Sequence, residues 1–344
     1  MDKRIDYIVF LRVFCTICVL LNHVPLVASH VFASRIQQVD LVVTNAVVHC
    51  VHFAVPVFVM ITGALLLNSS RTITVEKALK KYAWRMIVIL FTVGWGFAMM
   101  ELYFSTKNVS LDFFLNSFYA VLSGNTWRHM WYLYMLVGLY LLIPFLKPII
   151  DNLSQKNIVF LLVFLFIFSS LIPTLTYFWG FQMGVDFPIK SSYVLFLLLG
   201  WLLTQIQWNK SSWWLIWGGG CMTIFLMICS YLEITRGYQQ LKFWEGYNSP
   251  VEIGIVICLF AFCVKNKDKF KKIADNALVR LIDRNSFGIY VFHMLWVNVL
   301  YKVVKLNPFE YNYLLLLLIV VAILLLSIIT TEIFRKIPYI GKYI

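Results

Sequence analysis

The sequence predicts an all-α polytopic membrane protein with about ten transmembrane helices. Of its 344 residues, 61% are hydrophobic and 13% are charged, and the mean hydropathy is +0.81, far above that of water-soluble domains. Apolar runs of about 20 residues, the length that crosses a hydrocarbon core, recur along the chain. The polar joins between them are too short for a soluble domain, so residues 1–344 are expected to form one transmembrane domain.

Ten apolar runs are long enough to be spans. In chain order they are residues 5–28, 41–67, 83–105, 129–150, 157–176, 191–207, 212–232, 249–265, 284–305 and 312–334. The first is not followed by a convincing cleavage site and carries charged residues, so we expect it to be retained rather than removed as a signal peptide.

Lysine and arginine are distributed unevenly between the two sides of this topology. With the amino terminus in the cytoplasm, cytoplasmic segments hold 20 of the 29 and outer segments hold eight, while Arg12 lies inside the first span. Cytoplasmic loops of membrane proteins carry such an excess, so both termini are expected in the cytoplasm of a cell with a bacterial-type plasma membrane. The same placement explains the net charge of +13 without a nucleic acid partner.

Two ionisable side chains lie inside the first span, where each is costly and indicates function. Arg12 and His23 are eleven residues apart, which returns to the same helix face about 16 Å along the axis. His23 is either a packing histidine or a titratable group of a site. Arg12 needs an anionic partner or a water-filled cavity, and Glu101 in the third span lies at the wrong depth to be that partner. A ligand phosphate is therefore the expected partner.

A basic segment precedes the third span. Its sequence, EKALKKYAWRM, places Lys77, Lys81 and Arg85 on one helical face. This cluster indicates either anchoring at the cytoplasmic surface or a phosphate-binding funnel below Arg12. No comparable basic cluster is expected near the outer position of His23.

The seven cysteines lie almost entirely within apolar runs, where free cysteine behaves as a small hydrophobic residue. Cys15 and Cys18 form a C-x-x-C motif, but no second cysteine or histidine pair has the spacing that would complete a metal site. The sequence therefore predicts neither a disulfide framework nor a metal.

Five segments form an ordered set along the chain. They are the step from Arg12 to His23 and the sequences VPVFVMITGALLL, KKYAWR, WRHMWYLYMLVGLYLLIP and NSFGIYVFHML. Together, and in register with the expected topology, they resemble the acyltransferase-3 family of integral membrane O-acyltransferases over nearly the whole chain. The chain resembles the stand-alone form, without the extracytoplasmic hydrolase-like domain of some relatives.

The resemblance implies transfer of an acyl group, commonly acetyl from cytoplasmic acetyl-CoA, to a hydroxyl of an extracytoplasmic glycan or lipid-linked saccharide. By position, Arg12 and His23 match the family's pair in the first span, and His23 is its catalytic candidate. Lys81 and Arg85 match its basic motif, although the family more often has arginine where this chain has Lys81. Arg12, Lys81 and Arg85 would thus bind the acyl-CoA.

Acyl transfer needs a base, a group that stabilises an oxyanion, and groups that position the reactants. His23 would act as general base or, alternatively, carry the acyl group as an acyl-imidazole. Trp131 is expected to bind the oxyanion or orient the substrate, unless it belongs to an interfacial aromatic belt. Ser286, Tyr290 and His293 share one face of the ninth span. The first two are expected to orient the donor, and His293 to pack.

Two other classes of function remain compatible with the sequence. A secondary transporter or flippase for an anionic or glycan-linked substrate would also need many spans and a charged cavity, but the internal repeat common in transporters is not evident. A noncatalytic sensor or assembly scaffold is the other alternative. The acceptor, the acyl chain length and the oligomeric state stay open.

Overall fold

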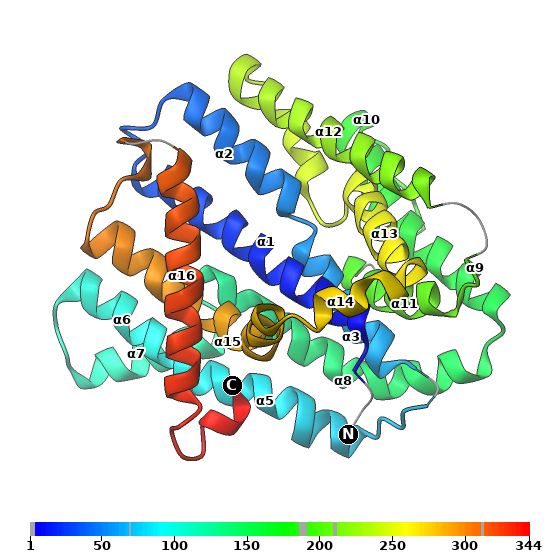
Figure 1. The fold of residues 1–344 in the computed structure, drawn as a ribbon, viewed down its shortest axis with the longest axis horizontal. Coiled ribbons are helices and arrows are strands. Elements are labelled where there is room, and N and C mark those ends of the chain that lie inside the picture. Colours follow the sequence, from blue (N-terminus) through cyan, green and yellow to red (C-terminus); the bar gives the residue numbers. More distant parts are fainter. Residues whose placement is uncertain (1–3, 69, 186–190, 209–211, 311–312) are drawn as a thin grey trace.

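The computed structural model describes residues 4–68, 70–185, 191–208, 212–310 and 313–344. Every regular element in these segments is a helix (Figure 1). The chain is thus an all-α polytopic membrane protein, as the sequence predicts. Three lysines counted in the charge distribution, Lys3, Lys190 and Lys210, lie outside the described residues. So does residue 312, where the last expected span begins.

Eight helical segments of the described chain are long and apolar enough to cross a membrane. They comprise residues 6–31, 38–66, 75–106, 128–152, 155–179, 213–236, 239–265 and 314–334. Each overlaps one expected span. The remaining two expected spans, 191–207 and 284–305, fall on helices that do not meet both criteria.

Some of the long segments are single helices, and others consist of shorter helices joined by turns of another helical type. The helices are α1 (Asp6–Val31), α2 (Gln38–Val51), α3 (Ala54–Leu66), α4 (Val75–Lys77), α5 (Trp84–Ile89), α6 (Trp95–Thr106), α8 (Trp131–Asn152), α9 (Gln155–Phe166), α10 (Ile172–Trp179), α12 (Trp213–Arg236), α13 (Pro250–Lys265), α14 (Lys271–Ala274) and α16 (Tyr313–Phe334). Turns of π-helix, Ala78–Ala83 and Leu90–Gly94, join α4 to α5 and α5 to α6, and a third, Ile167–Leu171, joins α9 to α10. Such turns are frequent at functional sites.

The helices at these two expected spans, 192–205 and 277–298, fail the criteria for a membrane span for different reasons. α11 (Ser192–Gln205) has 14 residues, so it extends only about 21 Å, less than the roughly 30 Å of a hydrocarbon core. α15 (Ala277–Asn298) is long enough but carries Asp283 and Arg284. It begins before the expected boundary of 284 because the Asn276 side chain caps its first backbone N–H groups.

One helix of more than ten residues in the described chain has no counterpart among the expected spans. α7 (Leu111–Leu122) begins after Ser110, whose hydroxyl accepts a hydrogen bond from the backbone N–H of Phe113. Twelve residues extend about 18 Å, too short to span a bilayer. α7 packs against α6 (Figure 1), so the connection before α8 is an ordered element and not an open loop.

α1 is the central helix of the fold, with contacts to α2, α3, α13, α14, α15 and α16. Arg12 and His23 of α1 contact Asp283 and His293 of α15 in the same chain order. The two helices therefore run parallel, as the first and ninth of alternating spans should. The shared face predicted for Arg12 and His23 is confirmed, because both meet α15. The side of the membrane on which the termini lie stays a prediction.

The contact between α3 and α11 depends on two glycines. A Cβ atom on Gly63 would lie 1.8 Å from the carbonyl oxygen of Leu197, and one on Gly200 would lie 2.1 Å from the carbonyl oxygen of Met60. The two backbones can approach this closely only because neither glycine carries a side chain.

Gly63→Ala should therefore destabilise the protein by about 1–3 kcal/mol or more, because a backbone carbonyl cannot move aside as a side chain can. Thermal unfolding in detergent measures the effect. Gly96→Ala is the matched control, because a Cβ there meets nothing within 4 Å and alanine favours helix. Equal melting temperatures for the two variants would contradict the packing described.

Candidate active site

A cavity of about 1000 Å³ opens beside the second half of α1. Its walls come from α1, α6, α7, the start of α8, the segment before α13, and α15. We call it the vestibule. Its lining residues include His23, His52, His129, Trp131 and Tyr247.

A smaller chamber of about 40 Å³ adjoins the vestibule. The two share six lining residues, which are Asn22, His23, His52, His129, Trp131 and Tyr247. Because about 10–15 Å³ suffices for one water molecule, the chamber has room for a few waters or one small group. Three imidazoles therefore face one small polar space within the helix bundle.

His23 is held by a second histidine. The Nδ1 atom of His23 lies 3.0 Å from the Nε2 atom of His293 on α15. His293 is fully buried, and its Nδ1 atom lies 2.7 Å from the carbonyl oxygen of Tyr290 and 3.2 Å from that of Ile289. The interpretation of His293 as a packing histidine is thus incomplete, because it contacts the residue predicted to be functional.

The backbone carbonyls fix the tautomers of this pair when both rings are neutral. A carbonyl oxygen only accepts hydrogen bonds, so Nδ1 of His293 carries the hydrogen and its Nε2 is the acceptor. His23 must then donate from Nδ1. The nitrogen left with a free lone pair is Nε2 of His23, on a residue that lines both cavities.

His129 and Tyr290 also line the chamber. Nε2 of His129 lies 3.1 Å from the carbonyl oxygen of Val291, and the hydroxyl of Tyr290 donates to the carbonyl oxygen of His129. These bonds tie the start of α8 to α15. The Nδ1 atom of His129 is buried and has no hydrogen-bond partner among the described residues.

The other residues predicted from the fourth and ninth spans do not all lie beside His23. Trp131 lines both cavities and lies in an aromatic wall with Tyr193 and Tyr247, at ring distances of 5.8 and 6.0 Å. Tyr290 lines the chamber. Ser286 lies one turn earlier on α15 and lines neither cavity, so the structure brings Trp131 and Tyr290 to His23 but not Ser286.

The predicted partner of Arg12 is corrected by the structure. Nη1 of Arg12 lies 2.6 Å from Oδ1 of Asp283, and both side chains are largely buried. The sequence argument found no carboxylate at this depth because the ninth span was expected to begin at residue 284. Arg12 is thus neutralised within the protein, although this contact occupies only one of its nitrogen atoms.

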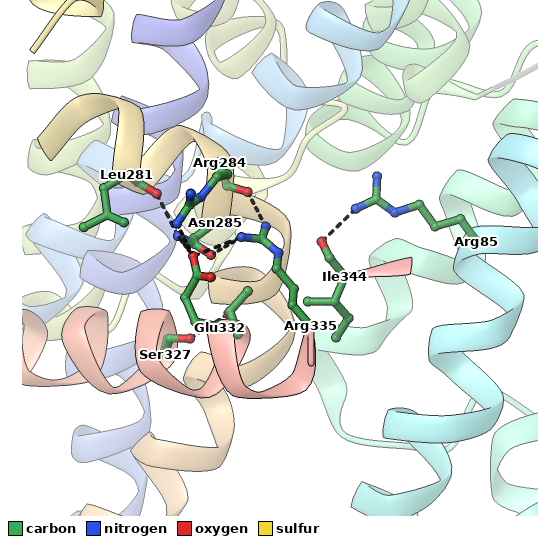
Figure 2. Close-up of polar contacts among 9 residues, drawn as sticks. Arg85, Leu281, Arg284, Asn285, Ser327, Glu332, Arg335 and Ile344 are labelled. Atoms are coloured by element: carbon green, nitrogen blue, oxygen red, sulfur yellow. Dashed lines mark hydrogen bonds and ion pairs between the residues drawn. The ribbon is translucent and has the colours of Figure 1, made fainter. Parts of the chain in front are cut away.

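The basic segment before α5, expected to be either a surface anchor or a phosphate-binding funnel, makes contacts of its own within the protein. Lys81 is exposed within a π-helical turn, with its ammonium 5.7 Å from the ring centre of Tyr82. Arg85 donates from Nε to the carbonyl oxygen of Tyr343 at 2.8 Å and from Nη2 to that of Ile344 at 3.1 Å. Figure 2 shows Arg85 pointing toward Ile344.

A polar network joins α15 to α16 beside this contact (Figure 2). Arg335 donates to the side chain of Asn285 at 2.8 Å and to the carbonyl oxygen of Arg284. Asn285, which is fully buried, donates to Glu332 at 3.0 Å. The network fixes α15, the helix that carries Asp283 and His293.

The vestibule carries positive charge that the sequence argument did not expect. Arg128, Lys242 and Lys302 line it, and each comes from a different part of the chain. Glu101 is the carboxylate in this lining, and it accepts a hydrogen bond from the indole of Trp127 at 3.1 Å. Three basic residues that are far apart in sequence therefore line the same cavity as His23.

Comparison with known proteins decides the family. The acyltransferase domain that defines the acyltransferase-3 family matches residues 5–332 of the 344 residues. The chain belongs to the acyltransferase-3 family. This confirms the resemblance drawn from five segments, and it makes the protein a membrane acyltransferase. No curated protein and no solved structure matches the chain.

Within this acyltransferase-3 chain, the sequence argument missed His52 and Glu252. His52 lines both cavities, and Glu252 is fully buried behind it. The acidic residue in the apolar 249–265 span was the available signal, since a carboxylate inside a span is costly. No group of three or more His, Cys, Asp or Glu in the described residues could hold a metal ion.

Proposed function

We propose that this acyltransferase moves an acyl group, most simply acetyl, from acyl-CoA on the cytoplasmic side to a hydroxyl of a glycan or lipid-linked saccharide on the outer side. The observation that carries the proposal is the His23–His293 pair, which leaves Nε2 of His23 unprotonated at the inner end of the vestibule. A neutral imidazole in a small polar chamber suits either role that acylation of a hydroxyl can use, which are proton transfer as a general base and transient binding of the acyl group.

The donor would approach from the end of the bundle that carries the basic segments. Arg12 lies about 16 Å below His23 on the same face of α1, and the nitrogen atoms of Arg12 that do not contact Asp283 can bind a phosphate. Lys81 and Arg85 lie nearer that end. Because Arg85 now binds the carbonyls of Tyr343 and Ile344, donor binding there would require the last residues to move.

The acceptor would enter through the vestibule. Its aromatic wall around Trp131 suits the face of a sugar ring. Its three cations, Arg128, Lys242 and Lys302, suit an acceptor that bears carboxylate or phosphate groups, such as an acidic glycan or a saccharide linked to lipid through phosphate. Trp131 makes no hydrogen bond among the described residues that would occupy its indole N–H, so it can donate to an oxyanion.

Radiolabelled acetyl-CoA tests the proposal directly. Purified protein in liposomes, supplied with cell-surface glycans and lipid-linked saccharides extracted from its host, should move the label onto the glycan or saccharide fraction. Absence of labelled product, together with glycan uptake by the same liposomes, would support the transporter alternative and contradict acyl transfer.

Replacing His293 tests its role in orienting His23. His293→Phe keeps the bulk but removes the acceptor for Nδ1 of His23, so the turnover number should fall about 10- to 100-fold, less than the full loss of a general base. KM for acetyl-CoA should stay unchanged. His293→Gln should recover part of the activity, because its amide oxygen can accept the same bond. Equal activity for Phe and Gln would contradict an orienting role.

A further inference from the structure

A buried carboxylate lies beside His52, one of the residues that line the chamber. Glu252 has no exposed surface, and neither of its carboxylate oxygens has a hydrogen-bond partner among the described residues. Its polar neighbour is His52, whose Nδ1 atom lies 3.6 Å from Oε1. Burying a charged group without hydrogen bonds costs several kcal/mol, so this arrangement needs a reason beyond packing.

Local sequence places both residues. Pro56 has no N–H to donate to the carbonyl of His52 four residues earlier, and the helix between residues 38 and 66 is interrupted at His52. On the other side, Ser249 caps α13 and Pro250 begins it, which sets Glu252 in the first helical turn. A break in one helix thus meets the beginning of another.

The imidazole of His52 is held in a fixed orientation. It stacks on Tyr247, with ring centres 4.2 Å apart and an angle of 10° between the planes. Its side chain remains 24% exposed, and it lines both the vestibule and the chamber, as His23 does. One edge of the ring therefore faces Glu252 while the residue remains open to the cavity.

His23 and His52, two of the three histidines that line the chamber, have different groups beside their Nδ1 atoms. His23 donates to a neutral imidazole, whereas His52 has a carboxylate beside its Nδ1 atom. At 3.6 Å the carboxylate makes no hydrogen bond to Nδ1, but its negative charge would stabilise the imidazolium that forms when Nε2 takes a proton. His52 is thus better suited to accept a proton, and His23 to act as an unprotonated nucleophile.

We propose that His52, supported by Glu252, takes the proton of the acceptor hydroxyl, while His23 carries the acyl group between donor and acceptor. This inference rests on the proposed function. In the first step, Nε2 of His23 bonds to the thioester carbonyl carbon, the C–S bond breaks, and CoA leaves as a thiolate. In the second, the acceptor oxygen bonds to that carbon, its proton passes to Nε2 of His52, and the C–N bond to His23 breaks.

The size of the chamber agrees with two separate steps. At about 40 Å³ it accommodates a small acyl group, whereas the donor and the acceptor lie on opposite sides of it in the proposed path. His52 returns its proton to water of the vestibule, and the thiolate is protonated in the cytoplasm. The sum of the steps is one ester and one thiol for each thioester and hydroxyl consumed.

Isotope exchange distinguishes the proposed role of His23 from that of His52. If His23 carries the acyl group, the wild-type protein without acceptor should move label from radioactive CoA into acetyl-CoA. His52→Asn and Glu252→Gln should retain exchange within about threefold while transfer to the extracted glycan fraction falls at least about 100-fold for His52→Asn and about 10-fold for Glu252→Gln. His23→Asn should lose both reactions. Retained exchange also shows that a variant is folded.

The chain provides a matched control. His49 pairs with Glu245 at 2.8 Å one turn before His52, but neither residue lines the vestibule or the chamber. His49→Asn should retain exchange and transfer. Absence of exchange in an active wild-type protein, loss of exchange in both His52→Asn and Glu252→Gln, or full transfer by either would overturn the inference. Transfer that survives His23→Asn would refute the acyl-carrying role of His23, whereas absence of labelled product from the wild-type protein would instead refute the proposed function.

Discussion

His23→Ala should abolish transfer of label from acetyl-CoA to the glycan fraction. The expected loss is at least about 10²-fold, because His23 carries the acyl group in the proposed mechanism and no other histidine among the described residues has the same support from His293. The variant should insert and fold normally, because His23 is partly exposed to the cavities and its removal leaves a buried acceptor rather than a buried charge. Initial rates of product labelling, corrected for the amount of protein, measure the effect.

His30 is the control for this substitution. It lies two turns later on α1, lines the outer part of the vestibule and is exposed. His30→Ala should therefore retain most of the activity. If His23→Ala kept more than about a tenth of the wild-type rate, His23 would not carry the reaction.

Arg12→Ala should weaken binding of acyl-CoA about 10- to 100-fold, the range expected when one charge-assisted hydrogen bond is lost. It should also destabilise the protein, because Asp283 loses its partner at a largely buried position. Titration of the purified variants with CoA, together with thermal unfolding, measures both effects.

Substitution of Asp283 distinguishes the two roles of Arg12, which are binding of CoA and contact between α1 and α15. Asp283→Asn keeps the guanidinium and removes its internal counter-charge, so CoA should bind at least as tightly as in the wild type. Combining Arg12→Ala with Asp283→Asn removes the unpaired carboxylate and should restore stability but not CoA affinity. If the double variant bound CoA normally, Arg12 would serve only to hold α1 against α15.

Much of the fold follows from the order of apolar and polar residues. Apolar runs of about 20 residues place the long helices within a few residues at most ends, because the length needed to cross a bilayer is fixed. The boundary of α15 could not be placed this way, since its first turns are charged and its beginning is set by the cap at Asn276. The interruption at His52 depends on Pro56, whose effect also varies with its surroundings.

The candidate site was predicted less completely. The eleven-residue step on α1 correctly placed Arg12 and His23 on one face, because helical geometry relates residues on the same helix. The spacing of residues along the sequence does not show which residues of different helices contact each other. The pairs Arg12 with Asp283, His23 with His293, and His52 with Glu252 join residues about 200 or more positions apart, so each becomes visible only in the folded chain.

Sidedness is the measurement that tests the central claim most directly. Membrane vesicles that expose the cytoplasmic face, with host glycans trapped inside and radiolabelled acetyl-CoA added outside, should accumulate labelled glycan in the lumen. Vesicles with His23→Asn should not. Labelled glycan that appeared only when acetyl-CoA and glycan shared one side of the membrane would contradict transfer across the membrane through His23.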